Sequence, residues 1–487
     1  MARESSARNV EKWGIFELTL NGPSKGNPFV DVRLAASFKF RNRTVEVGGF
    51  YDGDGIYRIR FMPDREGKWS YVTRSNRREL TGSAGEFVCT PPGRGNHGPV
   101  DVYRYFHFAH ADGTRHYSFG TTCYAWIHQP RMLQEQTLRT LAKGPFNKIR
   151  MCVFPKHYLY NANDPQFYAF LPKRPPRKGR YTWDFKRFDV RFWRMLENRV
   201  GQLRELGIEA DLILFHPYDR WGFANLDAAT EGRYLKYLIA RLSAYRNVWW
   251  SMANEWDFMK TKTVKDFDRF FRIVRENDPY RHLRGVHNGR LFYDHAKPWV
   301  THCSVQHSDL SKVGEWRQQY GKPVVVDECC YEGNIERRWG NIPGWELVNR
   351  FWTGVVGGGY VGHGETFVHP KDVLWWSKGG RLYGESPKRI AFLRRILEQA
   401  PKAALEPISL ARGNDALARV GRYYLFYYGI KQPAVMPMEL PPRARFTVEI
   451  IDTWNMTIRK LPGTFGGKFR LKLPGRPFIA VRVRKVT

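Results

Sequence analysis

Apolar and polar residues repeat with different periods in three successive parts of the chain, and in the first part they alternate. Residues 57–61 place aromatic and aliphatic side chains on one side and arginines on the other, which is typical of a strand with one buried face. The turn sequence Asp-Gly-Asp-Gly at residues 52–55 separates two such runs. A stretch rich in Pro and Gly at residues 91–99 then indicates a linker. We therefore predict an N-terminal β-sandwich over residues 1–95.

Between residues 100 and 402 the pattern changes to short strand-forming runs that alternate with helices. Strands are predicted at residues 117–123, 149–154, 211–215, 248–252, 283–286, 300–305 and 323–326, and from residue 360. Helices are predicted at residues 132–142, 188–206, 234–245, 264–274, 345–355 and 387–399. The fifth unit is the weakest, because the pattern shows no helix between residues 288 and 300. Strands and helices in this order predict a TIM barrel.

Alternation returns in the last part of the chain, residues 403–487. Strand-like runs at residues 423–428 and 446–451 predict a second, smaller β-sandwich. This part carries no catalytic motif, so we expect it to pack on the barrel and to be structural. The predicted fold class is thus α/β, a (β/α)8 TIM barrel flanked by two β-sandwich domains.

Two of the predicted barrel strands end in carboxylates. Asn254 and Glu255 follow the apolar run 248–252, and Glu328 follows the valines of the seventh strand. Catalytic groups of TIM barrels sit at the C-terminal ends of the strands, so both glutamates are expected on the same rim. Glycoside hydrolysis needs such a pair, one carboxyl to protonate the leaving oxygen and one to attack the sugar or activate water. For either motif taken alone, a solvated turn is the alternative.

Aromatic and polar side chains at the ends of other strands are candidates for binding a sugar. The residues predicted to contact or support the substrate are Asn254, Arg150, Trp126, His216, His307, Trp256, Glu365 and Trp375. Among them Trp256 would give Glu255 an apolar setting, and Arg150 would keep Glu328 ionised. A structural ion pair is the alternative for Arg150, and a structural role is the alternative for each histidine. Because no His-Glu-x-x-His spacing occurs, we predict neither a metal nor a cofactor.

Composition narrows the class of protein. The chain has 487 residues, of which 42% are hydrophobic and 15% aromatic, which indicates a folded protein with several cores. Its six cysteines show no CxxC spacing, which favours free thiols in a reducing compartment. The N-terminal residues are polar and no apolar run reaches membrane-spanning length, so the sequence predicts a cytoplasmic protein without a signal peptide or a membrane partner. It does not predict an oligomeric state.

A formal net charge of +32 suggests anionic partners or a highly charged, soluble surface. No zinc finger, helix-turn-helix or RNP-like signature accompanies the charge, so we do not expect nucleic acid as a partner. One segment without acids is strongly basic, with cations at Lys173, Arg174, Arg177, Lys178 and Arg180. Because it follows the second strand, we place it beside the catalytic mouth, where it favours an anionic carbohydrate such as a uronide. A purely solvated loop is the alternative.

These motifs are similar to those of a known group of enzymes. Asn-Glu after a fourth strand and Glu after a seventh resemble the clan GH-A glycosidases. The Trp-Gly-Ile-Phe-Glu opening at residues 13–17 and the hairpin turn resemble a domain that precedes bacterial glycosidase candidates catalogued as domains of unknown function. The resemblance covers nearly the whole chain. It implies a retaining glycosidase with Glu255 as acid/base and Glu328 as nucleophile, and Asn254 bonded to the 2-hydroxyl of the sugar. Two alternatives remain, a catalytically silent carbohydrate-binding protein and a basic nucleic-acid-binding protein.

Overall fold

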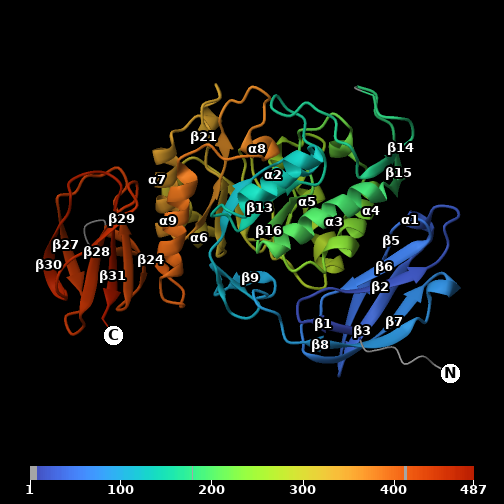
Figure 1. Cartoon of the computed structure of the whole chain (residues 1–487), viewed down its shortest axis with the longest axis horizontal. Helices are drawn as coiled ribbons and strands as arrows, with labels where there is room; N and C mark the ends of the chain where they lie inside the picture. Colours follow the sequence, from blue (N-terminus) through green and yellow to red (C-terminus); the bar gives the residue numbers. More distant parts are fainter. Residues whose placement is uncertain (1–7, 178, 411–413, 487) are drawn as a thin grey trace.

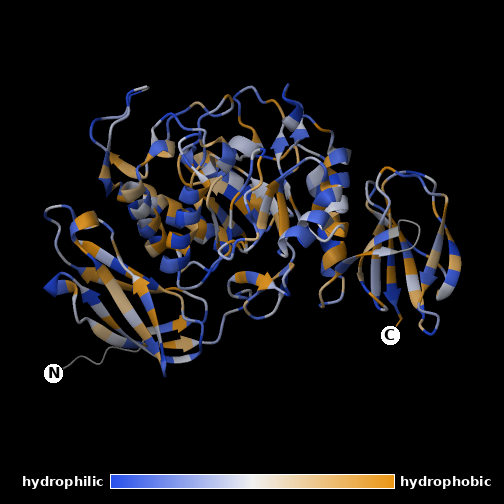
Figure 2. Ribbon diagram, turned by 180° about the vertical axis from the view of Figure 1, so that it is seen from behind, coloured by the Kyte–Doolittle hydropathy of each residue, from blue (hydrophilic) through white to orange (hydrophobic). Residues whose placement is uncertain are grey.

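The computed structural model describes residues 8–177, 179–410 and 414–486, which form three parts in a row. A barrel lies in the centre of Figure 1, with the N-terminal domain on one side and the C-terminal domain on the other. Figure 2 shows hydrophobic residues gathered in the barrel strands, and alternating colours along the strands of both outer domains. Both observations agree with the periods found in the sequence.

The central domain contains eight parallel strands. In chain order they are β12 (Phe119–Thr122), β13 (Lys148–Cys152), β16 (Glu209–Ile213), β17 (Val248–Ser251), β18 (Arg284–Gly285), β19 (Cys303–Gln306), β20 (Val324–Glu328) and β22 (Tyr360–His363). Neighbours in this order pair in parallel, β22 pairs with β12, and a bridge between His287 and Ser304 joins the remaining gap. The strands therefore close into a barrel, as predicted. Almost every strand residue is buried, because helices cover the outside and side chains fill the inside.

Helices surround the barrel. The principal ones are α2 (Arg131–Leu141), α3 (Val190–Glu205), α4 (Ala228–Leu242), α5 (Val264–Asn277), α6 (Val313–Tyr320), α7 (Gly344–Val356) and α9 (Ser386–Glu398). The α4 helix begins earlier than predicted, because the side chain of Asp227 accepts a hydrogen bond from the N–H of Thr230 and so caps it. The prediction missed α6, a short helix in which Val313, Trp316 and Arg317 are the buried residues. Residues 286–302, all of which are described, form no helix, as expected for the weak fifth unit.

The N-terminal domain contains two β-sheets. In spatial order, one sheet has β1 (Arg8–Glu11), β8 (Ala84–Thr90), β7 (Gly67–Ser75), β3 (Leu34–Phe40) and β4 (Arg43–Gly48). The other sheet has β2 (Phe16–Asn21), β6 (Ile56–Phe61) and β5 (Phe50–Tyr51), and a short helix, α1 (Pro28–Asp31), precedes β3. Aromatic rings fill the space between the sheets, for example Phe38 of the first sheet, stacked on Phe61 of the second at 4.1 Å between ring centroids.

A small antiparallel sheet follows the linker and covers the N-terminal end of the barrel. It consists of β9 (Val100–Tyr103), β10 (His107–His110) and β11 (Arg115–His116). Phe108 is fully buried against the rings of Trp249 and Tyr360, which lie near the starts of barrel strands. Residues 100–116 thus close the N-terminal end of the barrel. In TIM barrels this end contains residues that stabilise the fold.

The C-terminal domain also contains two β-sheets. Its larger sheet has the order β24 (Glu406–Leu410), β25 (Asn414–Arg419), β26 (Tyr423–Tyr427), β31 (Ile479–Lys485), β28 (Phe446–Asp452) and β29 (Thr457–Lys460). Its smaller sheet pairs β27 (Val435–Leu440) with β30 (Gly467–Lys472). The domain packs on α7 through its larger sheet. The ring of Tyr427 in β26 lies against Trp352, and the Tyr427 hydroxyl donates to Oδ1 of Asn349 at 2.9 Å. The expected packing on the barrel is therefore present.

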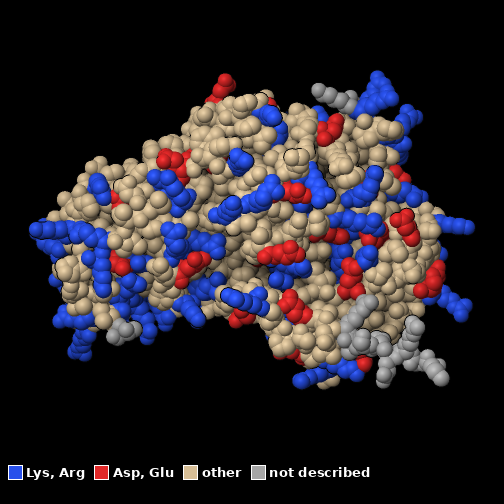
Figure 3. All heavy atoms as spheres, viewed as in Figure 1, with Lys and Arg blue, Asp and Glu red and all other residues tan. Residues whose placement is uncertain are grey.

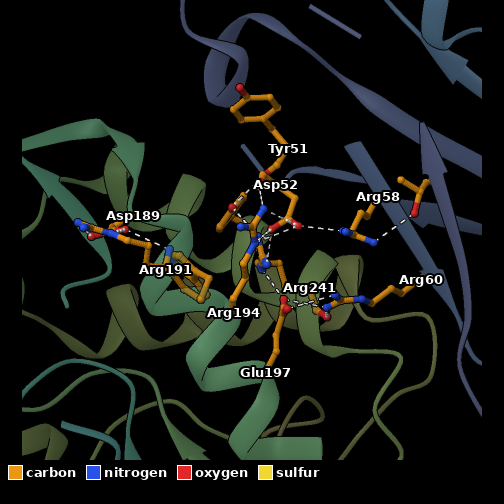
Figure 4. A network of polar contacts seen from close by, with 12 residues as sticks. Tyr51, Asp52, Arg58, Arg60, Asp189, Arg191, Arg194, Glu197 and Arg241 are labelled. Carbon is orange, nitrogen blue, oxygen red and sulfur yellow. Dashed lines mark hydrogen bonds and ion pairs between the residues drawn. The ribbon is translucent and has the colours of Figure 1, made fainter. Parts of the chain in front are cut away.

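Asp52, in the turn of the N-terminal sandwich, attaches this domain to the barrel (Figure 4). Its carboxylate is 2% exposed and accepts hydrogen bonds from Arg58 of its own domain, from Arg194 of α3 and from Arg241 of α4. Glu197 of α3 also accepts from Arg241. Burial alone would raise the pKa of Asp52, but the surrounding guanidinium groups lower it. The turn that the sequence predicted is thus also the contact between two domains.

Shorter elements interrupt the connections at the C-terminal ends of the barrel strands. A hairpin of β14 (Phe170–Pro172) and β15 (Trp183–Phe188) follows β13. Two short strands, β21 (Glu332–Gly333) and β23 (Glu365–Thr366), pair in parallel, and a one-turn helix, α8 (Trp375–Lys378), lies before α9. None of the helices that the structure describes has the length and apolar character needed to span a bilayer.

Candidate active site

Glu255 and Glu328 line one cavity of about 230 Å³ at the C-terminal ends of the barrel strands, called the glutamate cavity below. Most of its other lining side chains are aromatic, polar or charged. They include Tyr124, Lys156, Tyr158, Tyr160, Tyr218, Gln306, Tyr331, Arg337, Trp339 and Trp376. They come from the ends of different strands, which is how TIM barrels assemble their sites.

Glu255 is held by the strands on both sides of β17. The N–H of Asn254 donates to the carbonyl of Phe215 at 3.0 Å, and the N–H of Trp256 donates to the carbonyl of His287 at 3.0 Å. Between these anchors Glu255 adopts φ 50°, in the left-handed region that is unfavourable for residues other than glycine. Backbone strain of this kind persists where neighbouring contacts enforce it, and it concentrates at functional sites.

The carboxylate of Glu255 meets polar groups on both oxygens. Nδ2 of Asn254 donates to Oε2 at 2.9 Å, and Nε2 of Gln306 donates to Oε1 at 3.5 Å. Tyr218 is close enough that burial and the charge of Glu255 together raise the pKa of the phenol well above its usual range. Oδ1 of Asn254 is buried and has no hydrogen-bond partner among the described residues.

Glu328 is the last residue of β20. The hydroxyl of Tyr124 donates to Oε1, and the indole Nε1 of Trp339 donates to Oε2 at 3.2 Å. Burial raises the pKa of Glu328 to about 7, although the indole N–H opposes the shift. Gln306 lies between the two glutamates, because its backbone pairs with Glu328 while its side chain reaches Glu255.

Arg150 does not form the predicted ion pair with Glu328. Its guanidinium lies 3.4 Å from Asp211 and 3.9 Å from Asp327 inside the barrel, where Lys148 also contacts Asp327 at 2.6 Å. The reason is register, since Arg150 of β13 stands directly opposite Asp211 of β16. The structural ion pair that the sequence left as an alternative is therefore the arrangement found.

Several other predicted contact residues lie outside the glutamate cavity. Trp126, Trp256, His216 and Trp375 are buried, and each makes a hydrogen bond within the protein through a ring nitrogen. The cavity is lined instead by Trp376. Trp375 and Trp376 are adjacent in the sequence, and consecutive residues point in different directions, so the sequence does not indicate which indole faces the cavity.

Glu365 and His307 also lie elsewhere. The Glu365 carboxylate accepts the backbone N–H groups of residues 383 and 384, and burial raises its pKa to about 7. Glu332 accepts the N–H groups of residues 385 and 386, so both carboxylates anchor the segment that enters α9. Glu332, His363 and Glu365 offer ligand atoms within 4.8 Å of one another and could hold a metal ion, although the carboxylates already have these structural partners. His307 is half-buried and bonds to Asp309.

Two of the cavity residues that the sequence analysis missed carry a signal that could have identified them. Tyr124 and Lys156 follow their strands within a few positions, as Asn254 and Glu255 do. The same rule, that a polar or aromatic residue just beyond an apolar strand faces the catalytic end, would have included both. Tyr331 and Trp339 lie on the connection after β20, where only the tertiary structure shows which side chains turn inward.

The basic segment forms the tip of the β14–β15 hairpin, which projects from the barrel in Figure 1. Lys178 lies outside the described residues, and the other cations of this segment are exposed. None of the described residues of the segment lines the glutamate cavity. Figure 3 shows Lys and Arg spread over the visible face, and dense over the C-terminal sandwich at the left. The solvated alternative therefore describes this segment better.

Comparison with protein families places the chain. Residues 103–390, more than half of its length, match the apiosidase-like catalytic domain. This chain belongs to the apiosidase-like family. The outer domains of this apiosidase-like protein match two domains of unknown function, DUF5060 at residues 9–76 and DUF5605 at residues 414–484. The resemblance to glycosidase candidates with domains of unknown function is thereby confirmed.

Solved structures similar to this chain are also glycoside hydrolases or candidates for that activity. A candidate glycoside hydrolase from Bacteroides vulgatus ATCC 8482 is 42% identical to the apiosidase-like chain, with a TM-score of 0.94 over 98% of this chain and 100% of that one. A glycoside hydrolase of family 5 from the same organism is 15% identical, with a TM-score of 0.60 over 80% of this chain and 94% of the other, and shares the fold. Comparison with curated proteins gave no match.

Proposed function

We propose that this apiosidase-like protein is a retaining glycoside hydrolase in which Glu328 is the nucleophile and Glu255 the general acid and base. The observation that carries the proposal is that both glutamates line the same cavity at the catalytic end of the barrel, on either side of Gln306. The family and the 42% identical relative, itself named a candidate glycoside hydrolase, support the reaction class.

The reaction has two steps. In the first, a carboxylate oxygen of Glu328 forms a bond to the anomeric carbon while Glu255 gives its proton to the departing glycosidic oxygen. In the second, Glu255 takes a proton from water, whose oxygen bonds to the anomeric carbon and releases Glu328 as a carboxylate. The hydroxyl of Tyr124 and the indole N–H of Trp339 point at Glu328 and can hold its oxygens for the attack.

Burial alone would favour the opposite assignment, with Glu328 as the proton donor, because it raises the pKa of that carboxyl to about 7. The choice of Glu255 as the proton donor follows the Asn254-Glu255 motif. The buried, unpartnered Oδ1 of Asn254 supports the motif, since it can accept a hydrogen bond from the 2-hydroxyl of the sugar. Substrates with different leaving groups distinguish the two assignments, because only the proton donor is dispensable when the leaving group needs no protonation.

The ionisation of Glu328 predicts a pH profile. A nucleophile reacts as the carboxylate, so kcat/KM of the wild type is expected to fall as the pH drops below about 7. Trp339→Phe removes a donor that stabilises the charged form, so the midpoint should move upward by up to about one pH unit. Trp376→Phe removes an indole from the same cavity that does not bond to Glu328, and should leave the midpoint in place. An unchanged midpoint in Trp339→Phe would contradict this role of the indole.

Stereochemistry tests the proposal directly. Aryl glycosides of a panel that includes furanosides, apiosides and uronides are first screened for release of the aryl group, because the family name directs attention to apiosides. For the best substrate, early proton NMR spectra should show a first product with the anomeric configuration of the substrate, since a covalent glycosyl-enzyme lies on the path. An inverted first product would mean that water attacks directly and that Glu328 is not the nucleophile.

A further inference from the structure

Lys156 ends inside the glutamate cavity among three tyrosines. Its Nζ lies 3.5 Å from the ring centroid of Tyr124, 4.3 Å from that of Tyr218 and 5.1 Å from that of Tyr158. The residue is only 2% exposed, and it lines the cavity together with both glutamates. It follows β13, so the barrel directs it to the catalytic end.

This ammonium group forms no ion pair with the carboxylates that line the same cavity. Within the described residues, Nζ of Lys156 makes neither a hydrogen bond nor an ion pair, and no carboxylate lies within ion-pair distance of it. The faces of the aromatic rings attract a cation, but they replace only part of the hydration that an ammonium group loses on burial. Burial accordingly lowers the pKa of Lys156 to about 8, although the negative charge of Glu255 in the same cavity opposes the shift. An anionic group on a ligand would give the ammonium of Lys156 the ion-pair partner that the described residues do not provide.

We propose that Lys156 binds the carboxylate of an acidic sugar in the glutamate cavity, so that the enzyme selects uronic acids over neutral sugars. The inference rests on the proposed function, because it identifies the sugar class taken at the same site. A carboxylate pairs with the ammonium through a charge-assisted hydrogen bond, whereas a neutral hydroxyl leaves the buried charge uncompensated. The sequence analysis attributed a preference for anionic sugars to the basic hairpin, which is exposed. The present proposal attributes this preference to one buried cation, Lys156.

The test measures binding, not turnover. Wild-type protein is titrated at pH 7 with glucuronate, galacturonate and mannuronate, and with glucose, galactose and mannose as their neutral counterparts, and Kd is measured by NMR. At least one uronate should bind about tenfold or more tightly than its counterpart, as expected for a hydrogen bond between charged groups. Lys156→Met keeps an unbranched side chain among the tyrosines without the charge, and should reduce that preference to less than about twofold.

Three controls accompany the variant. Lys173→Met removes one cation from the exposed hairpin and should keep the wild-type preference. Thermal unfolding shows whether Lys156→Met is folded, and Lys156→Gln serves as a second neutral variant. The comparison of uronates with neutral sugars on the wild-type protein does not depend on the folding of any variant.

Two results would overturn the inference. One is that the wild type prefers no uronate, and the other is that the preference survives in both neutral variants of Lys156. If it survives because these variants weaken uronates and neutral sugars equally, Lys156 has a positioning role for the glutamates. The titrations measure binding and do not depend on hydrolysis. If the protein prefers uronates but hydrolyses no glycoside, only the proposed function is contradicted. Hydrolysis of neutral glycosides without a preference would contradict only the role of Lys156 in selecting uronates.

Discussion

Glu328→Gln is expected to lower kcat by on the order of 10⁴- to 10⁶-fold, with every leaving group, if this residue is the nucleophile. The amide keeps the shape of the side chain and can still accept the hydrogen bond from Tyr124, so the fold should persist. It cannot form the glycosyl-ester intermediate. Pre-steady-state measurements with a nitrophenyl and a dinitrophenyl glycoside should show no burst of aryl release. A fluorosugar that labels the wild type should not label the variant.

The matched control is Glu336→Gln, the same chemical change at an exposed glutamate on the connection after β20. Its kcat should stay within about twofold of the wild type, as is usual for surface substitutions. If Glu328→Gln keeps near-normal rates on the dinitrophenyl substrate and fails only with poor leaving groups, Glu328 is the proton donor. The two roles would then be exchanged, as its raised pKa alone would suggest.

Glu255→Gln is expected to divide substrates by their leaving group. Loss of general acid catalysis costs on the order of 10²- to 10⁴-fold where the departing oxygen needs a proton, as in an oligosaccharide. A dinitrophenolate leaves without protonation, so formation of the glycosyl-enzyme should stay nearly as fast as in the wild type. Its hydrolysis should then be slow, because no base activates water.

Azide provides the deciding measurement for Glu255. It needs no general base, so it should restore turnover of the dinitrophenyl glycoside by Glu255→Gln and yield a glycosyl azide of retained configuration. The same azide should leave the wild type and Glu336→Gln unchanged. Failure of azide to restore turnover, with a folded variant, would remove Glu255 from the acid/base role. A lost burst with both aryl leaving groups would instead point to Glu255 as the nucleophile.

Much of the architecture followed from local patterns. Period-two alternation predicted the strands of both outer domains, because such strands bury one face. Short apolar runs predicted the barrel strands, because these strands are buried on both faces. The rule that catalytic groups follow barrel strands placed Glu255 and Glu328 on one rim, and both line the glutamate cavity. What escaped was weakly patterned, such as α6, or lay on connections between elements, such as Trp339.

The sequence by itself determined that eight barrel strands form, where each one lies to within a few residues, and that two glutamates stand at the catalytic end, since these depend on residue type and local period. Only the tertiary structure decided which neighbours meet. Register gave Arg150 to Asp211 and not to Glu328. The course of the connections beyond the strands set Trp376, not Trp375, in the cavity wall. It also enclosed Lys156 among tyrosines from separate strand ends. Side-chain partners across a barrel come from distant segments, and their directions depend on pairing that no local pattern encodes.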